Sequence, residues 1–103
     1  MNDELKQLIE DAAKLLGHRI YFTGPYPPYI DGQFGLEKFN PLDPERGDLM
    51  MVAMAMNKDF AVLSDGVVVI SDHSFTFTKG DHESLSLAIL RAASAVLHSR
   101  GGV

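Results

Sequence analysis

The chain has 103 residues, of which 46% are apolar and 22% charged, and this composition predicts one globular domain spanning residues 1–103. Nine Lys and Arg against fourteen Asp and Glu give a net charge of −5, which disfavours binding to nucleic acid or to an anionic membrane surface. The absence of cysteine excludes disulfides, thiolate catalysis and zinc sites with cysteine ligands. The sequence predicts no targeting segment and no membrane span, so we expect a cytoplasmic protein.

Apolar residues recur at helical spacing near the N-terminus and predict an amphipathic helix whose apolar face holds Leu5, Leu8, Ile9, Ala12 and Leu16. Asn2 or Asp3 can cap the start of this helix, and Gly17 can end it in the left-handed conformation. The apolar run 20–22 then predicts a short edge strand.

Residues 23–43 are predicted to form a long loop, because Pro25, Pro27 and Pro28 interrupt both helices and central strands. Aromatic side chains make this loop the best candidate for a protein-binding surface, since they supply contact area at low entropic cost. The candidate binding residues are Tyr26, Tyr29, Phe34 and Phe39. The alternative is that these rings only cover one end of the core.

A second helix is predicted to begin at Asp43, with its carboxylate as the N-cap and Pro44 in the first helical position. Its apolar stripe holds Leu49, Val52, Ala53 and Met56. Three further methionines, Met50, Met51 and Met54, spread the apolar character around the helix. We therefore expect this helix to be more buried than the first.

Three antiparallel strands are predicted after this helix. Asp65-Gly66 is typical of a two-residue type I′ turn, which pairs Leu63 with Val68. A second two-residue turn at Asp72-His73 pairs Ile70 with Phe75. One face of the sheet then carries Ala61, Leu63, Val68, Ile70, Phe75 and Phe77. The other face keeps four apolar residues, Phe60, Val62, Val67 and Val69, so we expect a helix or a second subunit to cover it, and we expect a homodimer.

The last predicted helix runs from Asp81 to Ser99, with Asp81 as its cap and Gly101-Gly102 after its end. The fold class is therefore α+β. It has an antiparallel sheet of three strands, or four if the run 20–22 joins it, with helices on both faces and the order α-(β)-α-β-β-β-α.

The densest polar clusters are Asp72-His73 and Asp81-His82. If these side chains met in space they could bind a divalent metal, and a small metal-dependent enzyme is the alternative function. Turn formation and helix capping explain the same residues, and the spacing matches no metal motif. We expect no enzymatic activity, no metal and no cofactor.

Two segments resemble small bacteriophage proteins of the NinX-like and phage ABA-sandwich group. The first is Phe39-Asn40-Pro41-Leu42-Asp43 followed by Gly47-Asp48 and an apolar helix, and the second is the closing helix 84–96. This resemblance implies a phage or prophage accessory protein in the bacterial host cytoplasm. It implies no catalytic residues, and we expect such a protein to act by binding a host or phage protein, in some cases one that belongs to a host defence system.

Overall fold

The computed structural model describes residues 3–32, 34–56 and 60–99. These residues contain three helices, α1 (Asp3–Leu15), α2 (Asp48–Ala55) and α3 (His82–Ser99). The six strands found in the same part of the chain form two antiparallel sheets. The first holds β1 (Ile20–Tyr21), β2 (Tyr29–Gly32) and β3 (Gly35–Lys38), and the second holds β4 (Phe60–Leu63), β5 (Val67–Ile70) and β6 (His73–Thr76). The α+β class and the order of the helices are confirmed.

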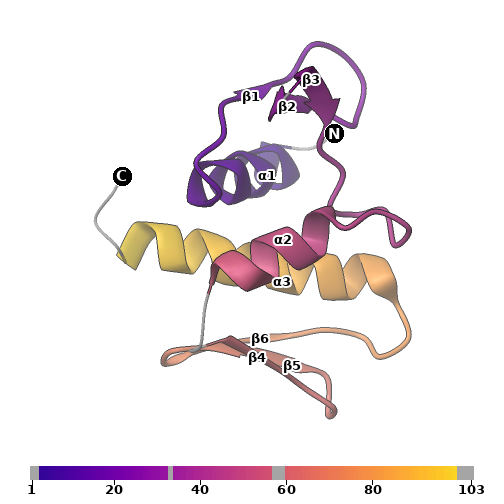
Figure 1. Cartoon of the computed structure of the whole chain (residues 1–103). Helices are drawn as coiled ribbons and strands as arrows, with labels where there is room; N and C mark the ends of the chain where they lie inside the picture. The colour runs from indigo at the N-terminus through magenta and orange to yellow at the C-terminus, as the bar shows by residue number, and fades with distance from the viewer. Residues whose placement is uncertain (1–2, 33, 57–59, 100–103) are drawn as a thin grey trace.

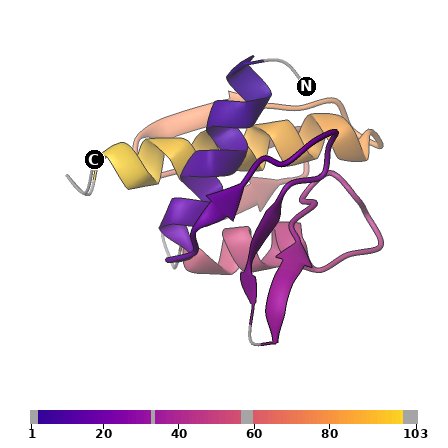
Figure 2. The same cartoon turned by 90° about the horizontal axis from the view of Figure 1, so that it is seen from above.

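The helices lie between the two sheets, with the first sheet beside α1 and the second sheet beneath α3 (Figure 1). Seen from above, α1 crosses α3, and the β2–β3 hairpin extends beyond the helices (Figure 2). The core runs through this middle layer and is formed by residues such as Ile9, Phe39, Val52, Val68 and Leu90. None of the helices in the described residues is long and apolar enough to cross a bilayer.

The C-terminal end of α1 is as the sequence predicts, because Gly17 takes the left-handed conformation with a φ of 81°. The Gly17 amide donates to Lys14 O and the His18 amide donates to Ala13 O, which is the Schellman pattern. Inside the layer, the buried carboxylate of Asp11 accepts a hydrogen bond from Ser94 Oγ on α3 at 2.7 Å. This polar contact fixes α1 against α3.

Helix α2 begins at Asp48, four residues later than a cap at Asp43 predicts. The Asp43 carboxylate does accept a backbone hydrogen bond, but from Glu45 in a turn that precedes the helix. The prediction that α2 is more buried than α1 is also wrong, because Met50 and Met54 are 64% and 73% exposed. Leu49 and Val52 are buried as expected.

Residues 23–43 contain a hairpin, so the prediction of one long loop is wrong. The three prolines all precede β2, and from Tyr29 onward nothing prevents strand pairing. Ile30 pairs with Glu37 and Gly32 pairs with Gly35. On the other side of β2, the predicted short strand pairs Ile20 with Ile30.

The predicted register of the second sheet is wrong by one residue at its first turn. Leu63 pairs with Val67, so the connection has three residues rather than two. Only the glycine of Asp65-Gly66 has a positive φ, 91°, and Leu63 O accepts from its amide. A three-residue loop that ends in a left-handed glycine needs one positive φ, whereas a type I′ turn needs two.

The second turn of this sheet is Ser71-Asp72 rather than Asp72-His73. Ile70 therefore pairs with His73, and Val68 pairs with Phe75. Ser71 takes the left-handed conformation, with a φ of 52°. This shift by two positions leaves Phe75 on the same face as predicted.

The corrected register regroups the two faces of the second sheet. The face toward the helices carries Phe60, Val62, Val68, Ile70 and Phe75, whereas Ala61 and Leu63 are on the other face and are exposed. Within the described residues, the helices cover one face of this sheet and not both. The single-residue slip decides which apolar residues meet solvent.

Candidate functional site

The four predicted binding residues do not form one surface. Phe39 is fully buried in the core, and Tyr26 packs against the core from the segment before β2. Tyr29 lies on β2 and is half-buried, and Phe34 at the turn of the hairpin is 90% exposed. The aromatic segment therefore divides into a buried base and an exposed hairpin.

The base of the hairpin is held by Asp48, the first residue of α2. Its buried carboxylate accepts hydrogen bonds from the Asn40 amide at 2.8 Å and from Arg46 Nε at 2.7 Å. The Arg46 guanidinium also donates to Lys38 O at the end of β3, and the carboxylate raises the pKa of this guanidinium. These contacts join the end of the hairpin to the start of α2.

Tyr26 completes the base. Burial raises the pKa of its phenol to about 12. The nearby Leu42 backbone acts in the opposite direction, and the negative charge of Asp48 acts in the same direction as burial. Its hydroxyl forms no hydrogen bond of good geometry with the residues that the structure describes. A buried phenol of this kind contributes packing rather than recognition.

The outer face of the first sheet, as we call it, is the exposed surface of the hairpin and of β1. Cross-strand pairing aligns Tyr21, Tyr29 and Lys38 in one row, while Asp31 and Leu36 form the next. The Tyr21 hydroxyl donates to Asp31 at 3.3 Å, and Leu36 is 57% exposed. Phe34 lies beside this face, at the turn that joins β2 to β3. Tyrosines and apolar side chains bordered by charges are the composition that protein interfaces favour.

Sequence reasoning missed Leu36, because it lay in a segment predicted as a loop. The alternation of Tyr29 and Asp31, followed by Leu36 and Lys38, is a period-two pattern that could have identified it. The pair Gly32 and Gly35 across the turn is a further hairpin signal.

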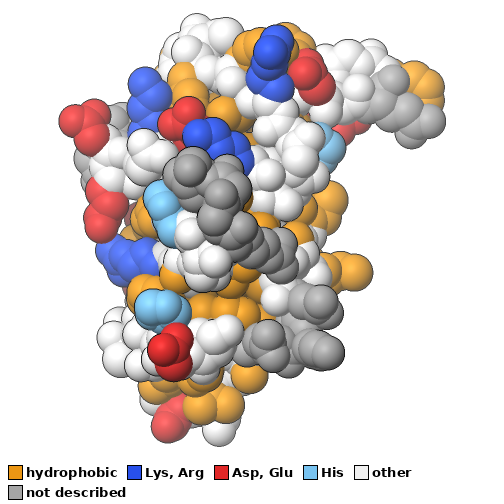
Figure 3. Space-filling view, turned by 90° about the vertical axis from the view of Figure 1, so that its left-hand side faces the viewer, with side chains coloured by type: hydrophobic (Ala, Val, Ile, Leu, Met, Phe, Trp, Pro, Cys, Tyr) orange, Lys and Arg blue, Asp and Glu red, His pale blue; other side chains and the backbone are white. Residues whose placement is uncertain are grey.

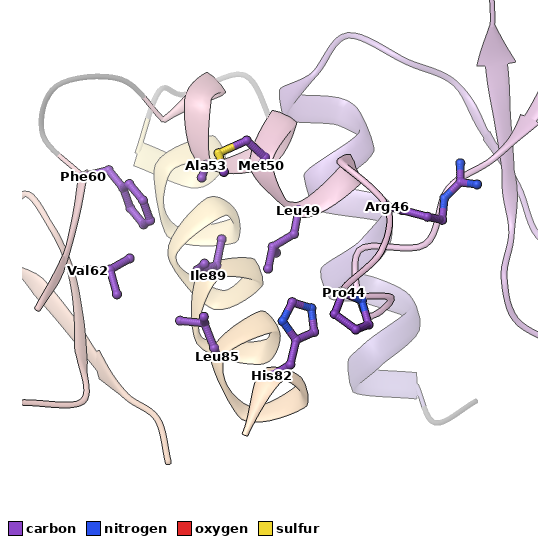
Figure 4. A pocket seen from close by; sticks show the side chains of 10 residues that line it. All are labelled: Pro44, Arg46, Leu49, Met50, Ala53, Phe60, Val62, His82, Leu85 and Ile89. Atoms are coloured by element: carbon purple, nitrogen blue, oxygen red, sulfur yellow. The ribbon is translucent and has the colours of Figure 1, made fainter. Parts of the chain in front are cut away.

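A second candidate is an open cavity of about 360 Å³ between α2, β4 and α3, which we call the α2–β4 cavity (Figure 4). Leu85 and Ile89 of α3 form its floor, and Phe60 and Val62 of β4 form one wall. The His82 side chain lies at its margin, and its Nε2 atom is buried without a hydrogen-bond partner among the described residues. The lining is otherwise mainly apolar.

On the face that Figure 3 shows, charged side chains are most frequent at the left, whereas hydrophobic side chains reach the surface in the middle, at the right-hand edge and at the bottom. Both candidate surfaces combine exposed apolar side chains with regular backbone elements that fix their positions. Exposed apolar patches on proteins with a well-formed core commonly mark contact surfaces.

The polar residues proposed for a metal site are separated by the length of α3. Asp72 and His73 lie beside Ala95 and Ser99 near its C-terminal end, and Asp81 and His82 lie at its N-terminal end. The 18 residues of α3 correspond to about 27 Å at 1.5 Å per residue. Among the described residues, no group of three or more His, Asp or Glu side chains could hold a metal ion.

Asp81 instead has the capping role that the sequence predicts. Its carboxylate accepts hydrogen bonds from the amides of Glu83 and Ser84 at the start of α3.

Comparison with protein-family models, with curated proteins and with solved structures finds no match to this chain.

Proposed function

We propose that this protein acts by protein–protein interaction and that it binds its partner through the outer face of the first sheet. The observation that carries the proposal is Phe34, a phenylalanine that is 90% exposed at the turn of a hairpin whose base is fixed in the core. Exposing a large aromatic ring to water is unfavourable unless a partner buries it. Aromatic anchors of this kind dominate the energetics of many interfaces.

The surroundings of Phe34 support the same role. Tyr29, Tyr21 and Leu36 supply further contact area, and Asp31 and Lys38 supply charges at the border. The hairpin is positioned before binding, because Asp48 and Arg46 hold its end and Ile30 is buried. A pre-positioned contact surface loses less conformational entropy when the complex forms.

The biological setting is part of this proposal. The resemblance of Phe39–Asp43, Gly47-Asp48 and the closing helix to small bacteriophage proteins supports an accessory role in the bacterial cytoplasm. The partner is then a host or phage protein. The net charge of −5 favours a protein partner over nucleic acid.

The test uses a photoreactive phenylalanine analogue in place of Phe34 in the chain expressed in a bacterial host. We expect a discrete adduct with another protein, and we expect Leu36→Glu in the same chain to reduce its yield several-fold. The matched control carries the analogue in place of Thr76, an exposed residue on the second sheet. Equal adducts from both positions, or none from position 34, would contradict the proposal.

A further inference from the structure

The two edges of the second sheet differ in chemistry. The edge strand β6 carries the polar residues His73, Ser74 and Thr76, all exposed. The opposite edge strand β4 reads Phe-Ala-Val-Leu, with no charge, no proline and no glycine, and its last three residues are exposed. Proteins usually protect a free strand edge with charged side chains, proline or a covering element, because its unpaired backbone groups recruit another strand. β4 has neither a charged side chain nor a proline, and no described strand pairs with its free side.

Helix α2 lies beside the same edge and is equally apolar. All seven residues after Asp48, from Leu49 to Ala55, are hydrophobic, and a helix that is apolar on all sides is normally covered on all sides. Its own chain covers Leu49 and Val52 and leaves Met50 and Met54 exposed. The α2–β4 cavity opens between this helix and this strand (Figure 4).

We propose that a second copy of this chain covers this edge, with β4 pairing antiparallel to β4 of the second copy about a two-fold axis. Directly opposed residues in such a pair share a face, so the axis passes beside a single residue. With the axis at Val62, the two Val62 side chains meet on the helical face. Leu63 then meets Ala61 of the second copy on the outer face, so exposed apolar residues become paired on both faces.

This pairing joins the two sheets into one of six strands. It also brings the two α2 helices toward the axis, where Met50 and Met54 from both copies close the two cavities. Methionine suits such a contact because its flexible side chain fills irregular gaps.

A second copy fits this edge better than an unrelated strand for two reasons. β4 contains no charge, so it does not repel its own copy despite the net charge of −5. A two-fold contact also covers the strand edge and the helix together, and two-fold dimers are the commonest assemblies. The contact uses β4 and part of an eight-residue helix, which is fewer than the roughly 20–30 residues per side of a standard interface. We therefore expect a dissociation constant in the range of roughly 1–100 μM rather than nanomolar.

The test compares two lysine substitutions that differ only in the edge they change. Ala61 and Ser74 both pair with Val69 from opposite sides, so they lie in one row and on one face of the sheet. In sedimentation experiments from about 1 to 200 μM, we expect Ala61→Lys to raise the dimer dissociation constant at least tenfold. Ser74→Lys should leave it unchanged, and thermal melts of both variants check that they fold.

A cross-link gives an independent readout, because the chain has no cysteine of its own. Val62→Cys should form a covalent dimer under mild oxidation, whereas Ser74→Cys should not. A wild-type chain that stays at 11.3 kDa over the whole range would overturn the proposal. A dimer that persists in Ala61→Lys would overturn it as well. Neither result would affect the adduct expected at position 34, which tests a separate surface.

Discussion

Phe34 and Phe39 are five residues apart, and the structure exposes one to 90% and buries the other completely. The base of the hairpin, around Phe39, Tyr26 and Asp48, is part of the core, whereas its turn lies beyond the helical layer (Figure 2). Both regions carry aromatic side chains, but only the turn exposes one fully to solvent. Aromatic content in a proline-rich segment therefore indicates either packing or binding, and the position relative to the anchoring contacts decides which.

The largest effect is expected at the base. Phe39→Ala should lower the free energy of unfolding by about 3–5 kcal/mol, because it removes a fully buried ring and leaves a cavity in the core. Chemical denaturation followed by circular dichroism measures this change. A loss below about 1 kcal/mol would show that the base is not part of the core, and the contrast with Phe34 would fail.

The second effect concerns the contact that holds the hairpin to α2. Asp48→Ala should lower the free energy of unfolding by about 1.5–3 kcal/mol, since the Asn40 amide and the Arg46 guanidinium lose a charged acceptor. Glu45→Ala is the control, because Glu45 is exposed and its loss should change stability by less than about 0.5 kcal/mol. Equal effects of the two substitutions in denaturant titrations would show that Asp48 does not anchor the hairpin.

The ends of the helices show what the sequence could and could not predict. Helices α1 and α3 were predictable because Gly17 and Asp81 mark their ends with local chemistry. The role of Asp48 was not, because a carboxylate that accepts from the Asn40 amide, eight residues earlier, leaves no local pattern. The start of α2 was predicted at Asp43 because Asp43 and Asp48 both satisfy the residue preferences of a helix N-terminus, and these preferences do not choose between them.

The predicted register of the second sheet was wrong for a different reason. Its strands Phe60–Leu63 and Val67–Ile70 are apolar at every position, so alternation cannot choose between registers one residue apart. The choice then rested on the turn, where a glycine with one positive φ fits a three-residue loop. The candidate site was predicted in part. Tyr29 lies on the outer face of the first sheet and Phe34 lies at its turn. The burial of Phe39 and the packing of Tyr26 against the core depend on tertiary contacts that composition does not encode.

The third test concerns Tyr26 and uses pH. Its phenol has a pKa of about 12 in the folded chain, against about 10 when the chain is unfolded. Between these values the unfolded chain binds fewer protons than the folded chain, so stability is complete below pH 10 and falls as the pH rises toward 12. Absorbance titration of tyrosinate should show one late step, which Tyr26→Phe removes. A late step that survives this substitution would place another tyrosine in the buried base.

The smallest effect on stability is expected at the turn. Phe34→Ala should change the free energy of unfolding by less than about 0.5 kcal/mol, because the ring contacts water in the free protein. The same substitution should abolish the interaction detected by a photoreactive group in place of Leu36, since an anchor residue contributes to binding and not to folding. Denaturation and cross-linking on one protein preparation measure both. If Phe34→Ala destabilised the fold by several kcal/mol, the ring would be a packing residue like Phe39. This result would contradict the proposal that the exposed turn binds a partner.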